Sequence, residues 1–307
     1  MLNCVVDERF SDALKDAEEA DQLVASGIMS EEELATKKPF LGVPFSTKDC
    51  IEVKDLLNTC GLYYRKNYRA QEDAPVIKKM REAGAIPFAL TNTSELCMWW
   101  ESANCVHGRT KNPYDTYRTV GGSSGGEGAI QGSACSPFGI GSDVGGSIRM
   151  PAFFNGIFGH KPTRFVVNNL GLHPPSYSEE QKSMVSCGPM VRFAVDLMPM
   201  MKVIVLKEKL PDLRLDEPVN VKKLKIFYQE NDQGGHLVSS VSGFNFVNQL
   251  NLNAFFQVDK DIQDAFKKVI NHFKNSLKVE VKRVQIRRTK NGIAMWMVNM
   301  HSDKTPR

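Results

Sequence analysis

The chain has 307 residues, of which 42% are hydrophobic and 24% are charged, and its mean hydropathy is −0.30. These values are typical of a folded globular protein and exclude collagen-like, disordered and strongly charged classes. The net charge of +4 comes from 39 basic and 35 acidic residues, and no basic run is interleaved with aromatic residues. We therefore expect no nucleic-acid partner.

The seven cysteines are widely spaced and form no C-x-x-C pair. This pattern favours free thiols in a reducing compartment over a disulfide framework or a zinc site, so we expect no metal. The longest apolar window, over 193–206, is interrupted by Asp196 and Lys202, and no signal peptide opens the chain. The sequence therefore predicts no membrane-spanning segment.

In the first third of the chain, apolar residues three to four apart predict a helix over 10–26, with Ser11 as its N-cap. A short apolar stretch over 37–45 contains two prolines and predicts a buried strand or strand edge. The pattern then predicts a helix over 74–83 and a strand over 85–91.

In the second half, the pattern predicts a helix over 191–205 that Pro199 interrupts, and a strand over 224–228. One apolar stripe runs the length of 260–277 and predicts the clearest helix in the chain. A strand is expected over 279–286. Because helices and strands alternate, we predict an α/β fold.

Residues 118–151 hold ten of the 23 glycines, which indicates backbone in unusual conformations or in close approach to a neighbour. A P-loop requires a Lys followed by Ser or Thr after its glycines, and none is present. A dinucleotide fingerprint requires a third glycine where Val144 stands. Nucleotide binding is therefore disfavoured.

The same segment contains G-x-S-x-G around Ser123, the pattern of an α/β-hydrolase nucleophile elbow. That elbow follows a buried strand, whereas the preceding residues NPYDTYRTV are polar and rich in turn formers. Ser124 matches the pattern in the next register, and none of the six histidines is an obvious partner. The pentapeptide alone is a weak signal.

A third interpretation is a serine hydrolase that uses lysine as its base. Ser123 and Ser147 each follow a Gly-Gly pair, and Lys48 ends the apolar stretch PFLGVPFSTK. Burial lowers the pKa of a lysine from about 10.4, so that the neutral amine becomes a general base. Taken singly, a lysine is usually a solvated surface charge and a serine in a glycine-rich loop usually caps a helix. Ser123 or Ser124 would then cap a helix that begins near Glu127.

Other residues also keep two interpretations. Met98, Trp99 and Trp100 would line an acyl pocket or belong to an aromatic core. Cys97 and Cys135 are expected to be small buried residues.

Three blocks decide between these alternatives: GVPFSTKD around Lys48, GGSSGGEGA around Ser123, and GSDVGGSIRMPAFFNGIFGHKPT around Ser147. In order and spacing they resemble the amidase signature family, and most closely its fatty-acid amide hydrolases. The resemblance implies that Ser147 is the acylated nucleophile and that Lys48 is the base. It also implies that Ser123 bridges them and follows a cis peptide bond at Gly122.

The resemblance further implies an oxyanion hole formed by the backbone amides of Val144, Gly145, Gly146 and Ser147. It implies supporting roles for Ser124, Asp143 and Arg149. The expected fold is a mixed, twisted central sheet with helices on both faces. The expected organisation is a single partial domain over 1–307, with its catalytic core at about 40–165 and its sheet incomplete on the C-terminal side.

The resemblance implies a serine amidase that hydrolyses lipid amides, such as fatty-acid amides and N-acylethanolamines, through an acyl-enzyme and without a cofactor. One alternative is a catalytically silent, truncated form or pseudo-enzyme that acts as a binding protein. Another is an amidase for small or aryl amides. As in its relatives, peripheral membrane contact and a homodimer are expected, with the full-length form cytoplasmic or membrane-associated.

Two departures from the family stand out. The chain begins after the region where such hydrolases carry a hydrophobic anchor and ends before the C-terminal part of the core, so we expect weak or absent activity. The 17 residues 241–257 contain no charged residue and have no recognisable counterpart in the family. Their ends, Val-Ser and Phe-Phe-Gln, are compatible with intron boundary codons, so the segment is either a translated intron or a surface-loop insertion.

Overall fold

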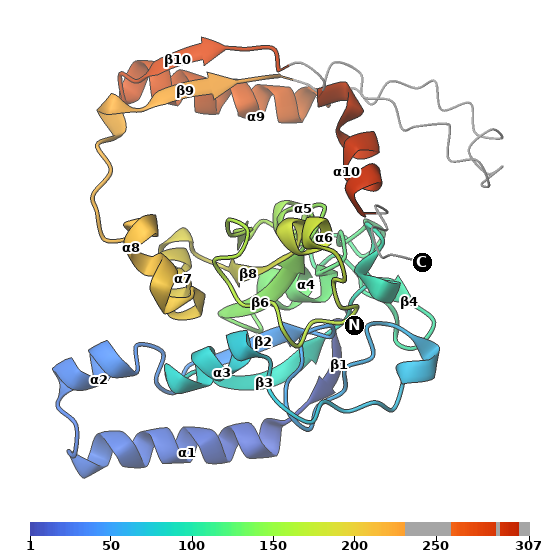
Figure 1. Cartoon of the computed structure of the whole chain (residues 1–307), viewed down its shortest axis with the longest axis vertical. Helices are drawn as coiled ribbons and strands as arrows, with labels where there is room; N and C mark the ends of the chain where they lie inside the picture. The colour runs from blue at the N-terminus through green and yellow to red at the C-terminus, as the bar shows by residue number, and fades with distance from the viewer. Residues whose placement is uncertain (231–258, 287–288, 301–307) are drawn as a thin grey trace. The chain divides into compact units, whose positions relative to one another are not determined.

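A computed structural model describes residues 1–230, 259–286 and 289–300 (Figure 1). The chain divides into two compact units, Met1–Leu215 and Asp216–Arg307. The single domain expected over 1–307 stays a prediction, and the segment 241–257 lies outside the described residues.

The first unit is built on a six-stranded sheet with the strand order β1-β3-β2-β6-β8-β7. The central strand β2 pairs in parallel with β3 and with β6, and the other pairings are antiparallel. A short hairpin, β4–β5, lies outside this sheet. The strands of this unit are β1 (Val5–Glu8), β2 (Pro44–Lys48), β3 (Ile86–Thr91), β4 (Ala103–Asn104), β5 (Gly108–Arg109), β6 (Phe138–Asp143), β7 (Phe158–Gly159) and β8 (Ser186–Val191).

Helices cover both faces of this mixed sheet, which confirms the predicted fold class. Side chains alternate along β6: Phe138 and Ile140 belong to the main apolar core, together with residues of α3 and α7. The positions between them, Gly139 and Gly141, face α4 and α5 on the other side. The helices of this unit are α1 (Phe10–Ser26), α2 (Glu31–Lys37), α3 (Pro75–Glu82), α4 (Gly125–Gly132), α5 (Arg149–Phe154), α6 (Glu179–Met184), α7 (Leu197–Ile204) and α8 (Leu210–Leu213).

The density of glycine is explained by the close approach of α4 to the sheet. A Cβ atom on Gly139 would overlap the carboxylate of Glu127, which belongs to α4. A Cβ on Gly126 would overlap the backbone of Asn92, just beyond β3. At Gly126 no side chain separates α4 from the end of β3, and at Gly139 the Glu127 carboxylate fills the space between α4 and β6.

Two predicted boundaries near the N-terminus are wrong. The helix over 10–26 forms as predicted, but Ser11 does not cap it, because the carboxylate of Glu8 accepts the Phe10 amide at 2.6 Å. The strand expected over 37–45 begins only at Pro44, as β2. A capping box at Ser30 and Glu33 starts α2, and that helix runs to Lys37.

The helix–strand unit over 74–91 forms as predicted, as α3 and β3. The helix expected over 191–205 begins only at Leu197, because 186–191 form a buried strand, β8. Pro199 does not interrupt α7, since it lies in the first turn, where a missing N–H leaves no hydrogen bond unmade.

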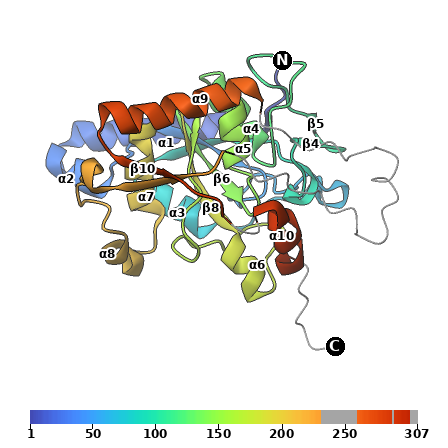
Figure 2. The same ribbon diagram turned by 90° about the horizontal axis from the view of Figure 1, so that it is seen from above.

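In the second unit, β9 (Lys225–Tyr228) and β10 (Glu280–Arg283) pair in parallel, and α9 (Lys260–Asn271) runs beside them (Figure 2). The rings of Tyr228 and Phe266 pack with centroids 5.8 Å apart. The predicted strand over 224–228 is confirmed. The helix expected over 260–277 is α-helical only to Asn271 and continues as a π-helical turn, His272–Ser276. The last described element is α10 (Gly292–Met300), which follows β10. Within the described residues, no helix combines the length and the apolar character needed to cross a bilayer.

Candidate active site

The side chain of Lys48 is the centre of the candidate site. It stands at the carboxyl end of β2 and is completely buried. Its Nζ atom lies 2.6 Å from Ser123 Oγ and 3.0 Å from Ser142 Oγ, and it also reaches the Ser142 carbonyl oxygen at 3.5 Å. Because β2 and β6 are parallel, their carboxyl ends meet at one edge of the sheet, where ligands bind in many α/β proteins.

The two glycine-rich loops meet beside this lysine. The Gly122–Ser123 peptide bond is cis, as expected. The Ser124 amide donates to the Ser147 carbonyl at 3.1 Å, and this bond joins the two serine loops. The hydroxyl of Ser124 donates to the Ser142 carbonyl at 3.3 Å instead of capping α4. No strand occurs over 113–120, so the geometry of a nucleophile elbow is absent from this segment.

Ser147 lies in the loop between β6 and α5 and is 6% exposed. Among the residues that the structure describes, none forms a hydrogen bond with its hydroxyl. The side chain is therefore shielded from bulk water but not engaged in the protein's own network.

Asp143 holds the Ser147 loop in place. Its buried carboxylate accepts the amides of Gly146 at 2.7 Å and Ile148 at 3.0 Å, and both of its oxygens accept from the Arg149 guanidinium at 3.0 Å. Burial is the largest single influence on Asp143 and raises its pKa. Arg149 and these amides together lower the pKa by more than burial raises it, so the pKa lies below its ordinary value.

The hydrogen bond from the Gly146 amide to Asp143 separates Gly146 from the other amides predicted to form an oxyanion hole. The Gly146 amide is directed at Asp143 and is not available to a ligand in this arrangement. The amides of Gly145 and Ser147 have no acceptor among the described residues. They, together with Val144, stay predicted oxyanion donors.

The expectation that burial lowers the pKa of Lys48 below its ordinary value is wrong in direction. Burial is the largest influence and lowers its pKa, but the nearby thiols of Cys97, Cys50 and Cys60 outweigh burial and raise the pKa above 10.5. Sequence reasoning missed this cluster because Cys60 and Cys97 are far from Lys48 along the chain.

Two buried carboxyl groups flank the lysine and were also missed. Glu127 accepts hydrogen bonds from Ser46 at 2.8 Å, Thr91 at 2.7 Å and Gln131 at 2.9 Å, yet burial raises its pKa to about 7. The available signal was that Glu127 is the single charged residue in the block GGSSGGEGA.

The second carboxyl group, Asp49, accepts the Thr59 amide at 2.8 Å and the Thr59 hydroxyl. Burial raises its pKa to about 7 as well. The side chain of His107 lies 3.8 Å from the Asp49 carboxylate and 3.1 Å from the Thr59 hydroxyl.

The aromatic-core interpretation of Met98, Trp99 and Trp100 is wrong, because these side chains are exposed. The expectation of a buried thiol is also wrong for Cys135, which is exposed, while Cys97 is half-buried. All seven cysteines are free thiols, as predicted.

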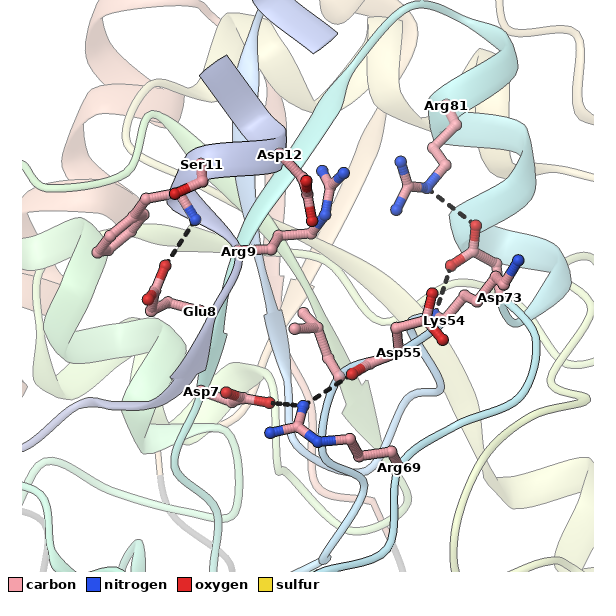
Figure 3. Close-up of a pocket in the computed structure, with 12 residues that line it drawn as sticks. Asp7, Glu8, Arg9, Ser11, Asp12, Lys54, Asp55, Arg69, Asp73 and Arg81 are labelled. Carbon is pink, nitrogen blue, oxygen red and sulfur yellow. Dashed lines mark hydrogen bonds and ion pairs between the residues drawn. The ribbon is translucent and has the colours of Figure 1, made fainter. Parts of the chain in front are cut away.

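Two pockets lie elsewhere in the first unit. The larger, of about 590 Å³, is charged, and its arginines pair with aspartates (Figure 3). Arg69 pairs with Asp7 at 2.8 Å, and Arg81 pairs with Asp73 at 2.9 Å. We assign it no catalytic role.

The second pocket, of about 430 Å³, is mostly apolar and is lined by residues such as Phe165, Leu170 and Val185. Leu172, which also lines this pocket, forms an antiparallel β-bridge with Ile51 in the loop after Lys48. An apolar surface therefore lies next to the loop that follows the lysine.

The fold and the site together define an α/β protein whose buried lysine and serine lie where parallel strands of a mixed sheet end. The family model described as Amidase matches residues 1–304, and the chain belongs to this family.

Among its relatives, human fatty-acid amide hydrolase 2 is 42% identical over 310 aligned residues, which cover 100% of this chain and 55% of the relative. Fatty-acid amide hydrolase 2-A of Danio rerio is 40% identical and covers 98% and 53%. A solved structure titled fatty acid amide hydrolase matches with a TM-score of 0.73 at 24% identity, covering 100% of this chain and 52% of that one. That likeness shows the fold, and the chain spans about half the length of the curated relatives it matches.

Proposed function

We propose that the chain is a serine amidase that hydrolyses the amide bond of lipid amides through an acyl-enzyme on Ser147. The observation that carries this proposal is the 2.6 Å contact between Lys48 and Ser123, buried beneath the loop that presents Ser147. A buried amine in hydrogen-bond contact with a hydroxyl is the geometry required of a general base.

In this mechanism the neutral amine of Lys48 removes a proton from Ser123, and Ser123 removes one from Ser147. The Ser147 oxygen then attacks the amide carbonyl. The proton returns through Ser123 to the departing nitrogen, which must be protonated because an amide anion is a very poor leaving group. Water, activated through the same relay, hydrolyses the acyl-enzyme and restores Ser147.

The developing oxyanion would be bound by the backbone amides of Val144, Gly145 and Ser147. One such donor contributes about 2.7–4 kcal/mol to the stability of the transition state. Asp143 and Arg149 would act on the reaction only indirectly, because they fix the conformation of the loop that carries the donors.

Two observations support a lipid amide over a small or aryl amide. Both curated relatives described above are named fatty-acid amide hydrolases. The exposed side chains of Trp99, Trp100 and Phe154 also belong to segments that touch the glycine loop, since Cβ atoms on Gly121 and Gly122 would meet them. Exposed apolar side chains near a reacting centre favour a substrate with an apolar chain. Peripheral membrane contact and a homodimer stay predictions.

The test has two parts. A fluorophosphonate probe is expected to label the chain at Ser147, and Ser147→Ala is expected to abolish the labelling, while Ser26→Ala, at the exposed end of α1, retains it. Hydrolysis is then compared for a long-chain ethanolamide, a primary fatty amide and a short aryl amide, and the long-chain substrates are expected to react fastest. A folded chain that is neither labelled nor active would instead support a catalytically silent binding protein.

A further inference from the structure

Three thiols lie around Lys48, and two of them, Cys60 and Cys97, come from positions that are distant in sequence. Cys50 follows the lysine by two residues, and its Sγ lies 3.3 Å from Ser142 Oγ, which itself contacts the Lys48 amine. Cys60 and Cys97 lie on two separate loops, and their sulfur atoms are 3.6 Å apart. The proposed mechanism uses none of these thiols.

Hydrogen bonds hold the two loops together, so that Cys60 and Cys97 stay in contact. The Leu96 amide donates to the Cys60 carbonyl at 2.9 Å. The Cys60 thiol donates to the carbonyl of His173 at 3.1 Å, and Cys97 Sγ lies 3.4 Å from Thr93 Oγ1.

Backbone strain marks the same positions. Cys60, Leu96 and Cys97 have φ angles of +50°, +53° and +59°, in a region that costs a residue with a side chain about 1–3 kcal/mol. Such strain persists only where the surrounding structure imposes it. The contact between the two sulfur atoms is therefore a fixed feature of the fold.

The two thiols differ in reactivity. Hydrogen bonds from Cys50 and Cys60 and the charge of Lys48 outweigh burial and hold the pKa of Cys97 well below 9.0. The pKa of Cys60 is raised well above 9.0 by its hydrogen bond to Cys97 and by burial. As a residue Cys97 is half-buried, whereas Cys60 is buried. A thiolate beside a second thiol is the arrangement of a redox-active pair.

We propose that Cys97 and Cys60 are a redox-active pair that reduces a hydroperoxide and closes to a disulfide beside Lys48. The Cys97 thiolate attacks the peroxide, the O–O bond breaks, and the products are Cys97 sulfenic acid and an alkoxide, which takes up a proton. The Cys60 sulfur then attacks the sulfenic sulfur. The S–S bond forms, the S–O bond breaks, and hydroxide leaves as water with the Cys60 proton. Two electrons pass from the thiols to the peroxide.

The disulfide would change the charge around Lys48, a consequence that rests on the proposed function. In the reduced protein the Cys97 thiolate stabilises the Lys48 ammonium, so the neutral amine that acts as the base forms only at higher pH. The other titratable groups that face these two residues are Asp49, Cys50 and Cys60 from the segment after β2, Glu127 from α4, Cys187 from β8, and His173. Once the thiolate is consumed, burial is the main remaining influence on the amine, so neutral Lys48 forms at lower pH.

The first test maps the bond directly. The purified chain is treated with hydrogen peroxide, alkylated and digested without reduction, and mass spectrometry is expected to find a Cys60–Cys97 cross-linked peptide that dithiothreitol releases. Cys60→Ser and Cys97→Ser are expected to lose it, and Cys135→Ser, at an exposed thiol, is expected to keep it. Sulfinic acid at Cys97, or a disulfide to another cysteine, would overturn the proposal, and this readout on the unmodified sequence does not depend on any variant folding.

The second test measures the acid limb of kcat/KM against pH for long-chain amide hydrolysis. Oxidation is expected to move this limb at least one unit lower, and Cys97→Ser is expected to do the same without oxidant. An unchanged limb in protein shown to carry the disulfide would refute the link to Lys48. Absence of hydrolysis in both redox states would contradict the proposed function instead, while the cross-link result would still decide whether the thiol pair exists.

Discussion

The charged groups of the first unit occur in two contrasting settings. Around Lys48 and Glu127, the groups are fully buried and are fixed by strand ends and the start of α4. In the pocket around Arg69 and Arg81, long side chains pair with aspartates at the surface. The contrast teaches that the number of charges does not mark a functional site. A functional site is marked by buried charged groups that water cannot reach, because the protonation of such groups depends on the surrounding protein.

The largest expected difference between the two regions is in activity. Lys48→Ala removes the proposed base, so kcat is expected to fall about 10³-fold, within the range typical of general-base catalysis. Arg69→Ala, in the charged pocket, is expected to keep its rate within about twofold. Initial rates of long-chain amide hydrolysis check this, with circular dichroism to verify folding. Equal losses in both variants would break the comparison.

The next effect is on stability. Asp143→Asn leaves the Arg149 guanidinium and two loop amides without their carboxylate, and breaking a buried pair of this kind costs about 3–5 kcal/mol. Arg149 is 56% exposed, so water compensates it in part and the lower value is expected. Urea unfolding measures the change. The matched control is Asp115→Asn, whose partner Arg118 is exposed, with an expected change below about 0.5 kcal/mol.

A smaller effect concerns pH. The pKa of Glu127 is raised to about 7, above its value of 4.5, so the native state binds more protons than the unfolded state between these values. The free energy of unfolding therefore falls as pH rises through this window. Glu127→Gln is expected to remove this fall and to gain about 2–3 kcal/mol relative to the original chain between pH 4.5 and 8.

Urea titrations at several pH values test this prediction, and exposed Glu19→Gln is the control. Asp49, whose pKa is also raised to about 7, keeps a similar slope in both proteins. Parallel stability curves for Glu127→Gln and the original chain would argue that Glu127 is ionised and solvated.

The smallest effect belongs to the surface pocket. Arg69→Ala removes a half-exposed ion pair with Asp7 and is expected to cost about 0.2–1 kcal/mol, a loss that shrinks in high salt. Thermal unfolding at low and high ionic strength measures it, with Lys15→Ala as a more exposed control. A loss of several kcal/mol that salt does not change would erase the distinction between the two regions.

The sequence predicts the parts of this molecule that depend on local pattern. The helix over 10–26 and the helix–strand unit over 74–91 are recognisable from periodicity alone, and ordered motifs place Lys48 and the two serines. It does not predict features that arise only when distant segments meet. Glu127 is buried because β2, β3 and α4 converge on it.

The pKa of Lys48 shows the same limit. Burial could be anticipated from the apolar stretch before it, but its effect is reversed by cysteines at positions 60 and 97, which loops bring beside the lysine. No periodicity connects those positions. Ser11 illustrates a local failure, because an equally good acceptor, Glu8, stood three residues earlier and took the amide of Phe10.

The backbone-to-backbone packing of α4 has a practical consequence for protein engineering. Because Gly126 brings the backbone of α4 against that of Asn92, the spacing between helix and sheet is fixed there by backbone atoms that no substitution removes. Resizing the apolar residues beneath α3 and α7, on the opposite face, should leave that spacing unchanged. The apolar residues of that face can then be varied in a library while the distance from Lys48 to Ser123 is conserved, and glycine replacements in α4 are the ones to leave out.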